Sequence, residues 1–183
     1  MRRREHGPVL GLTSTPRSMR PVAAAVIFAF LSLAPAPTGL AAQASPRQTV
    51  VRLYRAFAWE AVLDPAEDPT PGFVDQPLVV LTSYLTGDLA RLIVADRLCS
   101  RRSHDVCALD FEPLWDSQDV SASDMTIAPS QTDSTLVEVH YRAAGGTDGT
   151  QISYRLVHTT KGWRIADILY SNGHSLRAML SPR

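Results

Sequence analysis

The densest set of potential ligand groups in this 183-residue chain lies between positions 110 and 119. Asp110, Glu112, Asp116 and Asp119 place four carboxylates there, and we call residues 110–119 the acidic segment. Closely spaced oxygen ligands suit Ca²⁺, but the glycine and terminal glutamate of an EF-hand loop are missing. Aspartates also cap turns. We predict a structural loop held by its apolar residues, keep a ligand-binding surface as the alternative, and predict no metal ion.

A second candidate carboxylate is Asp167. Alternation along a strand places it on the same face as Trp163 and Ile165, and on a buried face it must be paired or protonated. The structural interpretation, which we favour, is an ion pair with Arg177 or Arg155. The alternative is a carboxylate with a raised pKa that acts as a general acid or base.

Catalysis by Asp167 would need a polar partner, for which Tyr54 and Tyr154 are the candidates. His140 and His158 are typical of solvated strand positions, and no Ser/His/Asp arrangement is apparent. We assign no catalytic residue beyond these candidates and predict no cofactor.

The chain has two cysteines, Cys99 and Cys107, and whether they form a disulfide depends on the compartment in which the protein works. In an oxidising compartment an even number of thiols pairs, so we predict one disulfide. Zinc is the rival interpretation because His104 and Asp105 lie between the thiols, but the rest of a tetrahedral ligand set is missing.

Residues 1–44 indicate such a compartment, because they have the layout of a signal peptide. A basic stretch ends at Arg20, an apolar run covers residues 22–34, and an A-x-A pattern places the cleavage before Ser45. The apolar run is shorter than the ~20 residues of a bilayer span, although an uncleaved anchor stays the alternative. We predict an exported protein, periplasmic or secreted, that starts at Met1 or Met19 and has no membrane span after processing.

Composition limits the function classes. The chain is 45% hydrophobic and 20% charged, which is ordinary globular composition. Its eighteen basic and eighteen acidic residues balance, but five of the basic ones and only one acidic one lie in the leader. The mature domain, residues 45–183, is therefore mildly acidic, which argues against nucleic acid as a partner.

The spacing of apolar residues, which predicts the elements that position these groups, changes from helical to strand-like along the chain. Helical spacing predicts helices over 48–62, 77–84, 86–98 and 175–180, and prolines predict a surface loop over 64–72. Alternation predicts antiparallel strands over 124–128, 137–142, 152–156 and 163–169. Helices followed by strands indicate a single α+β domain. The last strand has apolar residues on both of its faces, and the second face needs a cover. We therefore predict a homodimer through the sheet.

Several segments resemble the bacterial domain of unknown function 3828. They are Tyr54–Phe57, L-D-F-E-P-L at 109–114, D-S-Q-D at 116–119, G-W-R-I-A-D-I at 162–168 and S-L-R at 175–177. The resemblance implies an exported protein and a cone-like fold similar to nuclear transport factor two, with helices packed in a curved antiparallel sheet. It implies no established activity, and the lipidation cysteine of many members is absent. Polar residues of these segments are our binding candidates: Asp110, Asp116, Gln118, Asp119, Arg164 and Arg177.

We therefore predict a non-catalytic module that binds a small molecule or a protein. The alternative is an acid/base pocket enzyme of the isomerase or dehydratase kind that uses a buried carboxylate. A polar-lined pocket or a side-chain-filled core would discriminate between them.

Overall fold

The computed structural model describes residues 45–62, 70–143, 146 and 148–182, all within the unit Leu40–Arg183. The predicted leader and residues 64–69 of the predicted loop lie outside these ranges. Among the residues described, no helix has the length and apolar character needed to cross a membrane.

Four strands form one antiparallel sheet in the order β1-β2-β3-β4: β1 (Ser123–Pro129), β2 (Leu136–Arg142), β3 (Gly149–Thr159) and β4 (Gly162–Tyr170). Each strand pairs with its neighbour in sequence, which confirms the predicted strands. In β2 the buried residues Val137, Val139 and Tyr141 alternate with more exposed ones, so one face of the sheet is packed. With the helices described next, the domain is α+β, as predicted.

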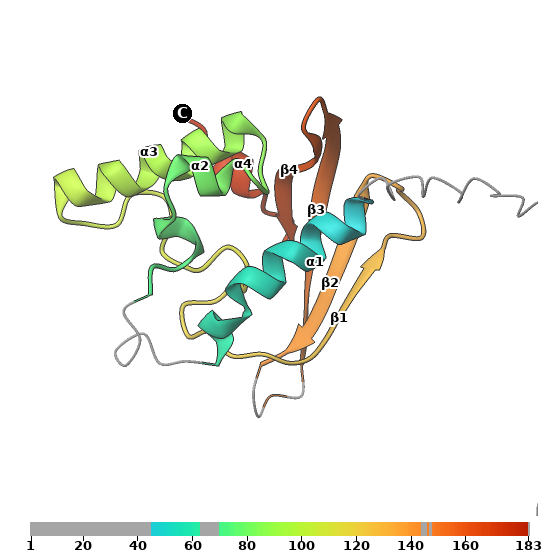
Figure 1. The fold of residues 1–183 in the computed structure, drawn as a ribbon. Coiled ribbons are helices and arrows are strands. Elements are labelled where there is room, and N and C mark those ends of the chain that lie inside the picture. Colours follow the sequence, from blue (N-terminus) through green and yellow to red (C-terminus); the bar gives the residue numbers. More distant parts are fainter. Residues whose placement is uncertain (1–44, 63–69, 144–145, 147, 183) are drawn as a thin grey trace, which may run out of the picture. The chain divides into compact units, whose positions relative to one another are not determined.

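Helix α1 (Pro46–Phe57) crosses the packed face of the sheet (Figure 1). Ser45 caps it, because its side chain accepts a hydrogen bond from the Gln48 backbone while the Gln48 side chain accepts one from the Ser45 backbone. Leu53 and Tyr54 lie on the buried face of α1. The predicted helix is confirmed to Phe57, after which the chain tightens into a 3-10 turn, η1 (Ala58–Ala61).

The other helices of the described ranges are η2 (Phe73–Asp75), α2 (Leu78–Leu81), α3 (Gly87–Ser103) and α4 (Leu176–Leu180). η2, α2 and α4 each pack against α3, and α3 and α4 also contact β4 (Figure 1). Thr86 caps α3 through its side chain and also joins α3 to the sheet, because its N–H donates to Ile165 O at 2.8 Å. The predicted end of this helix near position 98 is wrong. Arg101 and Arg102 favour continuation, since cations stabilise the negative end of a helix, and the helix ends at Ser103.

A β-bulge in β4 corrects the predicted arrangement around Asp167. Arg155 pairs with Asp167 but Leu156 pairs with Ile165, so Ala166 is an extra residue on β4. The bulge moves Asp167 off the face of Ile165. Strict alternation was therefore the wrong assumption at this point.

The same bulge explains why both faces of β4 read as apolar. Ile165 before the bulge and Ile168 and Tyr170 after it are all buried on one face. The pattern that predicted a homodimer thus has an explanation within one chain, and the dimer itself stays a prediction.

Candidate functional site

The acidic segment folds into a tight turn. The backbone N–H of Glu112 donates to Ser117 O at 2.9 Å, and that of Trp115 donates to Glu112 O at 2.9 Å. Leu114 and Trp115 are 0% exposed. The prediction that apolar residues of the segment fill the core is confirmed for these two, whereas Phe111 is only partly buried.

Tyrosine hydroxyls hold the inner part of this turn, the three residues Pro113, Leu114 and Trp115. Tyr170 donates to Pro113 O at 3.2 Å, Tyr54 donates to Leu114 O at 2.7 Å, and Tyr141 donates to Trp115 O. These three tyrosines come from β4, α1 and β2. Elements far apart in sequence therefore converge on successive carbonyl groups.

Tyr154 completes this cluster from β3, since its hydroxyl lies 2.7 Å from that of Tyr54. Burial raises the pKa of both groups, so they stay neutral near pH 7. Tyr54 and Tyr154, the predicted catalytic candidates, are thus occupied in holding the core together.

Behind the turn lies Glu60 of η1, a carboxylate that is only 8% exposed. It accepts hydrogen bonds from the Trp115 indole, at 2.9 Å, and from the backbone N–H of Phe73. Burial is the main cause that raises the pKa of Glu60. A Cβ at Gly72 would lie 3.1 Å from Glu60 Oε1 and 3.9 Å from Glu112 Oε1, so this close approach favours glycine.

A pocket of about 400 Å³ lies between α3 and the outer part of the acidic segment, and we call it the α3 pocket. This volume is within the range of small-molecule sites. Its apolar lining is Val74, Ile93, Leu109 and Phe111. Its polar lining is Asp96, Arg97, Ser100, Asp110, Glu112 and Gln118.

Unsatisfied polar atoms concentrate at this pocket. Among the described residues, three buried side-chain nitrogen or oxygen atoms have no hydrogen-bond partner, and two of them, Glu112 Oε2 and Arg97 Nε, belong to pocket-lining residues. Buried polar groups in folded proteins are nearly always paired, so such atoms call for an explanation. A ligand toward which these side chains turn when it enters the pocket is one.

Electrostatics single out Glu112. Burial, with the nearby carboxylates of Glu60 and Asp75, raises its pKa from 4.5 to about 7. Glu112 therefore changes charge close to neutral pH.

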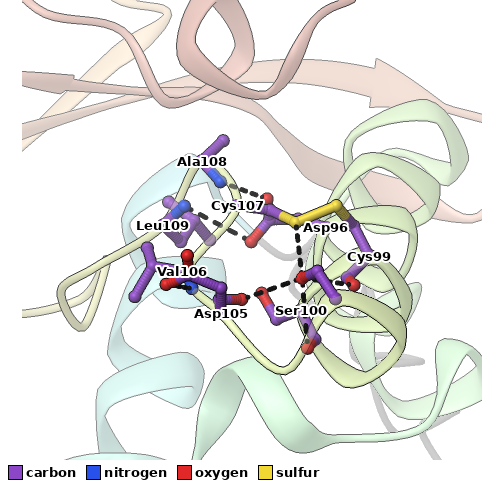
Figure 2. Close-up of a disulfide and its surroundings, with 9 residues drawn as sticks. Asp96, Cys99, Ser100, Asp105, Val106, Cys107, Ala108 and Leu109 are labelled. Atoms are coloured by element: carbon purple, nitrogen blue, oxygen red, sulfur yellow. Dashed lines mark hydrogen bonds between the residues drawn. A yellow bond between two sulfur atoms is a disulfide. The ribbon is translucent and has the colours of Figure 1, made fainter.

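The other charged lining residues are held by the protein itself. Arg97 donates through Nη1 to Val74 O at 3.0 Å and to Gln76 O at 2.9 Å, which fixes η2 against α3. Asp96 accepts hydrogen bonds from the backbone N–H groups of Ala108, at 2.7 Å, and Leu109, at 3.3 Å (Figure 2).

The predicted disulfide between Cys99 and Cys107 is present, with the two Cα atoms 6.1 Å apart. Figure 2 shows it beside Asp96, so two links tie the chain at 107–109 to α3. That chain leads directly into the pocket wall at Leu109 and Asp110. The disulfide therefore braces one side of the α3 pocket.

Within the ranges that the structure describes, no three His, Cys, Asp or Glu side chains gather in a group fit to hold a metal ion.

The structure brings only some of the predicted binding candidates to this pocket. Asp110 and Gln118 line it. Asp116 is not part of the lining and adopts a left-handed conformation with φ 47°. Burial raises its pKa, an effect that the nearby His174 only partly offsets. Asp119 is exposed and is not part of the lining.

Arg164 and Arg177 lie elsewhere and hold backbone carbonyl groups. Arg164 donates to Thr82 O at 3.0 Å and to Trp163 O at 2.8 Å. Arg177 donates through Nε to Ala166 O at 3.0 Å. Both join neighbouring segments to β4.

Asp167 is a helix-capping carboxylate at the end of β4. It accepts hydrogen bonds from the Ser175 hydroxyl at 2.7 Å and from the backbone N–H groups of Ile168 and Arg177 at 2.9 and 3.0 Å. The predicted contact with Arg177 exists, but through the Arg177 backbone. Among the described residues, neither Arg177 nor Arg155 forms an ion pair with Asp167.

Sequence reasoning missed Glu60 and the importance of Glu112. A signal for Glu60 was available, because it continues the buried series Val50, Leu53 and Phe57 at helical spacing. Glu112 was noted only as one of four acids. Nothing local distinguishes it, since its burial depends on η1 and η2.

No protein-family profile, curated protein or solved structure matches the chain.

Proposed function

We propose that this protein is an exported, non-catalytic binding module that takes a small molecule in the α3 pocket. One observation carries the proposal: two of the residues that line one pocket of ligand size, Glu112 and Arg97, each have a buried polar atom without a hydrogen-bond partner. The pocket also combines an apolar wall with a few fixed polar groups, which is typical of small-molecule sites.

The core on the packed face of the sheet supports a binding role over catalysis there. Trp115 and the tyrosine cluster fill the space between α1 and the sheet, and their hydroxyl groups are used in mutual or backbone hydrogen bonds. In a cone-like fold this is the place where a catalytic pocket would open. The α3 pocket lies outside it, between α3 and the acidic segment.

Export to the periplasm or the medium is part of the proposal. The leader pattern of residues 1–44 supports it, and the Cys99–Cys107 disulfide is compatible with an oxidising compartment. We also propose membership of the family of domain of unknown function 3828, with its cone-like, nuclear transport factor two-like fold. An antiparallel sheet packed on one face by the N-terminal helix is compatible with that fold.

A test uses a fragment library of amines, acids and neutral compounds, followed by amide chemical shifts of the full chain. We expect some fragments to shift the amides of Ser100, Asp110 and Gln118. Ser100→Trp should fill the pocket and abolish these shifts, whereas Ala95→Trp, on an exposed position of the same helix, should preserve them. If no fragment shifts these amides, or if Ser100→Trp leaves the shifts unchanged, the proposal is wrong.

A second candidate function is acid/base catalysis in the same pocket. The pKa of about 7 at Glu112 favours it, because a group that titrates near the working pH can both take and give a proton. The two functions differ in the fate of the ligand. A fragment that binds and is recovered unchanged after prolonged incubation supports the binding module, and conversion that Glu112→Gln abolishes supports the enzyme.

A further inference from the structure

The free hydrogen-bonding capacity of the α3 pocket determines which ligand class it can recognise. Both Asp96 oxygens accept backbone N–H groups, and Arg97 Nη1 already has two carbonyl partners. The groups with capacity to spare are one cation, Arg97 through its Nε, and two carboxylates, Glu112 with its buried Oε2 and Asp110 at the exposed rim. The two carboxylates outnumber the one guanidinium, so the charge available to a ligand is negative on balance.

The surroundings of Glu112 strengthen this negative field. Glu60 lies behind it from η1 and Asp75 from η2, and both act on Glu112 as like charges. Asp75 has a distant partner, Arg101, at 3.7 Å, on a half-exposed surface. A negative site with low-dielectric walls attracts a cation more strongly than an open surface does.

We infer that the α3 pocket binds a small organic cation, an ammonium group on a compact apolar body, with Glu112 as its counterion. The inference rests on the proposed function and names its ligand class. The ammonium N–H groups would pair with the Glu112 carboxylate once its buried Oε2 turns toward the pocket, and the apolar body would cover Ile93, Leu109 and Phe111. An aromatic or branched body of about ten heavy atoms suits the volume of about 400 Å³.

Proton competition follows from this arrangement. The charged groups around Glu112 are Glu60 from η1, Asp75 from η2, Asp96 and Arg97 from α3, and Asp110 of its own segment. Since the pKa of Glu112 is about 7, a cation must displace its proton below neutral pH. Affinity for the cation should therefore rise between pH 6 and pH 8.

The test compares three probes of nearly equal shape: phenethylammonium, 2-phenylethanol and phenylacetate. Each is titrated into the full chain at pH 8 and followed through the amides of Ser100, Asp110 and Gln118. We expect phenethylammonium to bind at least ten times more tightly than the alcohol and phenylacetate not to bind. Glu112→Gln should reduce the affinity for phenethylammonium to that for the alcohol and remove its pH dependence. Asp119→Asn, an exposed acid of the same segment, is the matched control and should change neither.

The outcomes separate this inference from the proposed function. If the alcohol or phenylacetate binds in the pocket as tightly as the ammonium probe, the pocket is a binding site but the cation class is wrong. If Glu112→Gln preserves the preference for the ammonium probe, Glu112 is not the counterion. If neither the probes nor the fragment library shift the pocket amides, both proposals fail.

Discussion

The two sides of the acidic segment differ in whether their polar groups have hydrogen-bond partners. On the inner side, residues 113–115 are buried and each of their carbonyl groups accepts a tyrosine hydroxyl. On the outer side, Asp110, Glu112 and Gln118 border a pocket in which Glu112 keeps a buried oxygen without a partner. One short segment thus joins a turn whose three inner carbonyl groups are all paired to a site with hydrogen-bonding capacity to spare.

This contrast separates stability from function. A satisfied network of aromatic groups rigidifies the turn, because an unpaired polar group in the core would be costly. A carboxylate with a pKa raised by burial and like charges lowers the stability of the folded state instead. Natural proteins tolerate that cost mainly where a site needs it. The predictions below test whether the two sides differ in this way.

The largest effect should come from the inner side. Trp115→Ala removes a side chain that is 0% exposed and leaves Glu60 without its indole donor. We expect a loss of about 3–5 kcal/mol in the free energy of unfolding, from the cavity and the unpaired carboxylate. Denaturant titration measures it. Val79→Ala, at a position 74% exposed, should change stability by less than ~0.5 kcal/mol. A small loss in Trp115→Ala would mean that the turn is not held by the core.

On the outer side, substitution of Glu112 should increase the free energy of unfolding instead of lowering it. The folded pKa of Glu112, about 7, exceeds the ordinary value of 4.5, so the folded state holds a proton that the unfolded state has lost between these two pH values. The free energy of unfolding contributed by this group is therefore highest below pH 4.5 and declines as the pH rises to about 7. Glu112→Gln removes this dependence and should be more stable than the wild type by roughly 3 kcal/mol at pH 8.

Thermal unfolding of both proteins at pH 5 and pH 8 checks this sign. At pH 5 the wild-type carboxyl group is already neutral in the folded state, so the two proteins should differ little. Asp119→Asn should match the wild type at both pH values. A Glu112→Gln variant that is less stable at pH 8 would show that the carboxylate supports the fold, and the contrast between the two sides would disappear.

The disulfide should affect the outer side alone. Cys99→Ala with Cys107→Ala opens a loop with a sequence separation of 8, for which chain entropy gives a loss of about 2.5 kcal/mol. Because Cys107 leads into Leu109 and Asp110, pocket amides should shift in the variant, while those of residues 113–115 should stay in place. Nuclear magnetic resonance reports both. Equal shifts on the two sides would indicate that the segment responds as one unit.

Periodicity and composition predicted most of this domain but not its pocket. The strands, the disulfide and the burial of Leu114 and Trp115 follow from local patterns. The bulge at Ala166 does not, because one inserted residue leaves no compositional trace and reverses the faces that follow it. The pocket depends on η1, η2 and α3 meeting the acidic segment, and such tertiary encounters are not encoded in any one window of sequence.

The smallest loss of stability is expected from variants of Asp167 and Arg177. If these two side chains formed a buried ion pair, their substitutions would be strongly coupled. The structure instead gives Asp167 the Ser175 hydroxyl and two backbone N–H groups, while the Arg177 side chain holds Ala166 O. Asp167→Asn keeps one oxygen to accept from the backbone, so we expect a loss of about 1 kcal/mol. Arg177→Ala removes two different hydrogen bonds, a good one to Ala166 O and a long one to Thr86 Oγ1, and should lose a similar amount. Their effects should add in the double variant to within ~0.5 kcal/mol in denaturant titrations, because truncating Arg177 retains the backbone N–H that Asp167 uses. A double variant that loses clearly less than the sum would reveal a direct charge interaction between the two side chains, and it would contradict the assignment of Asp167 to the Ser175 hydroxyl and the backbone N–H groups alone.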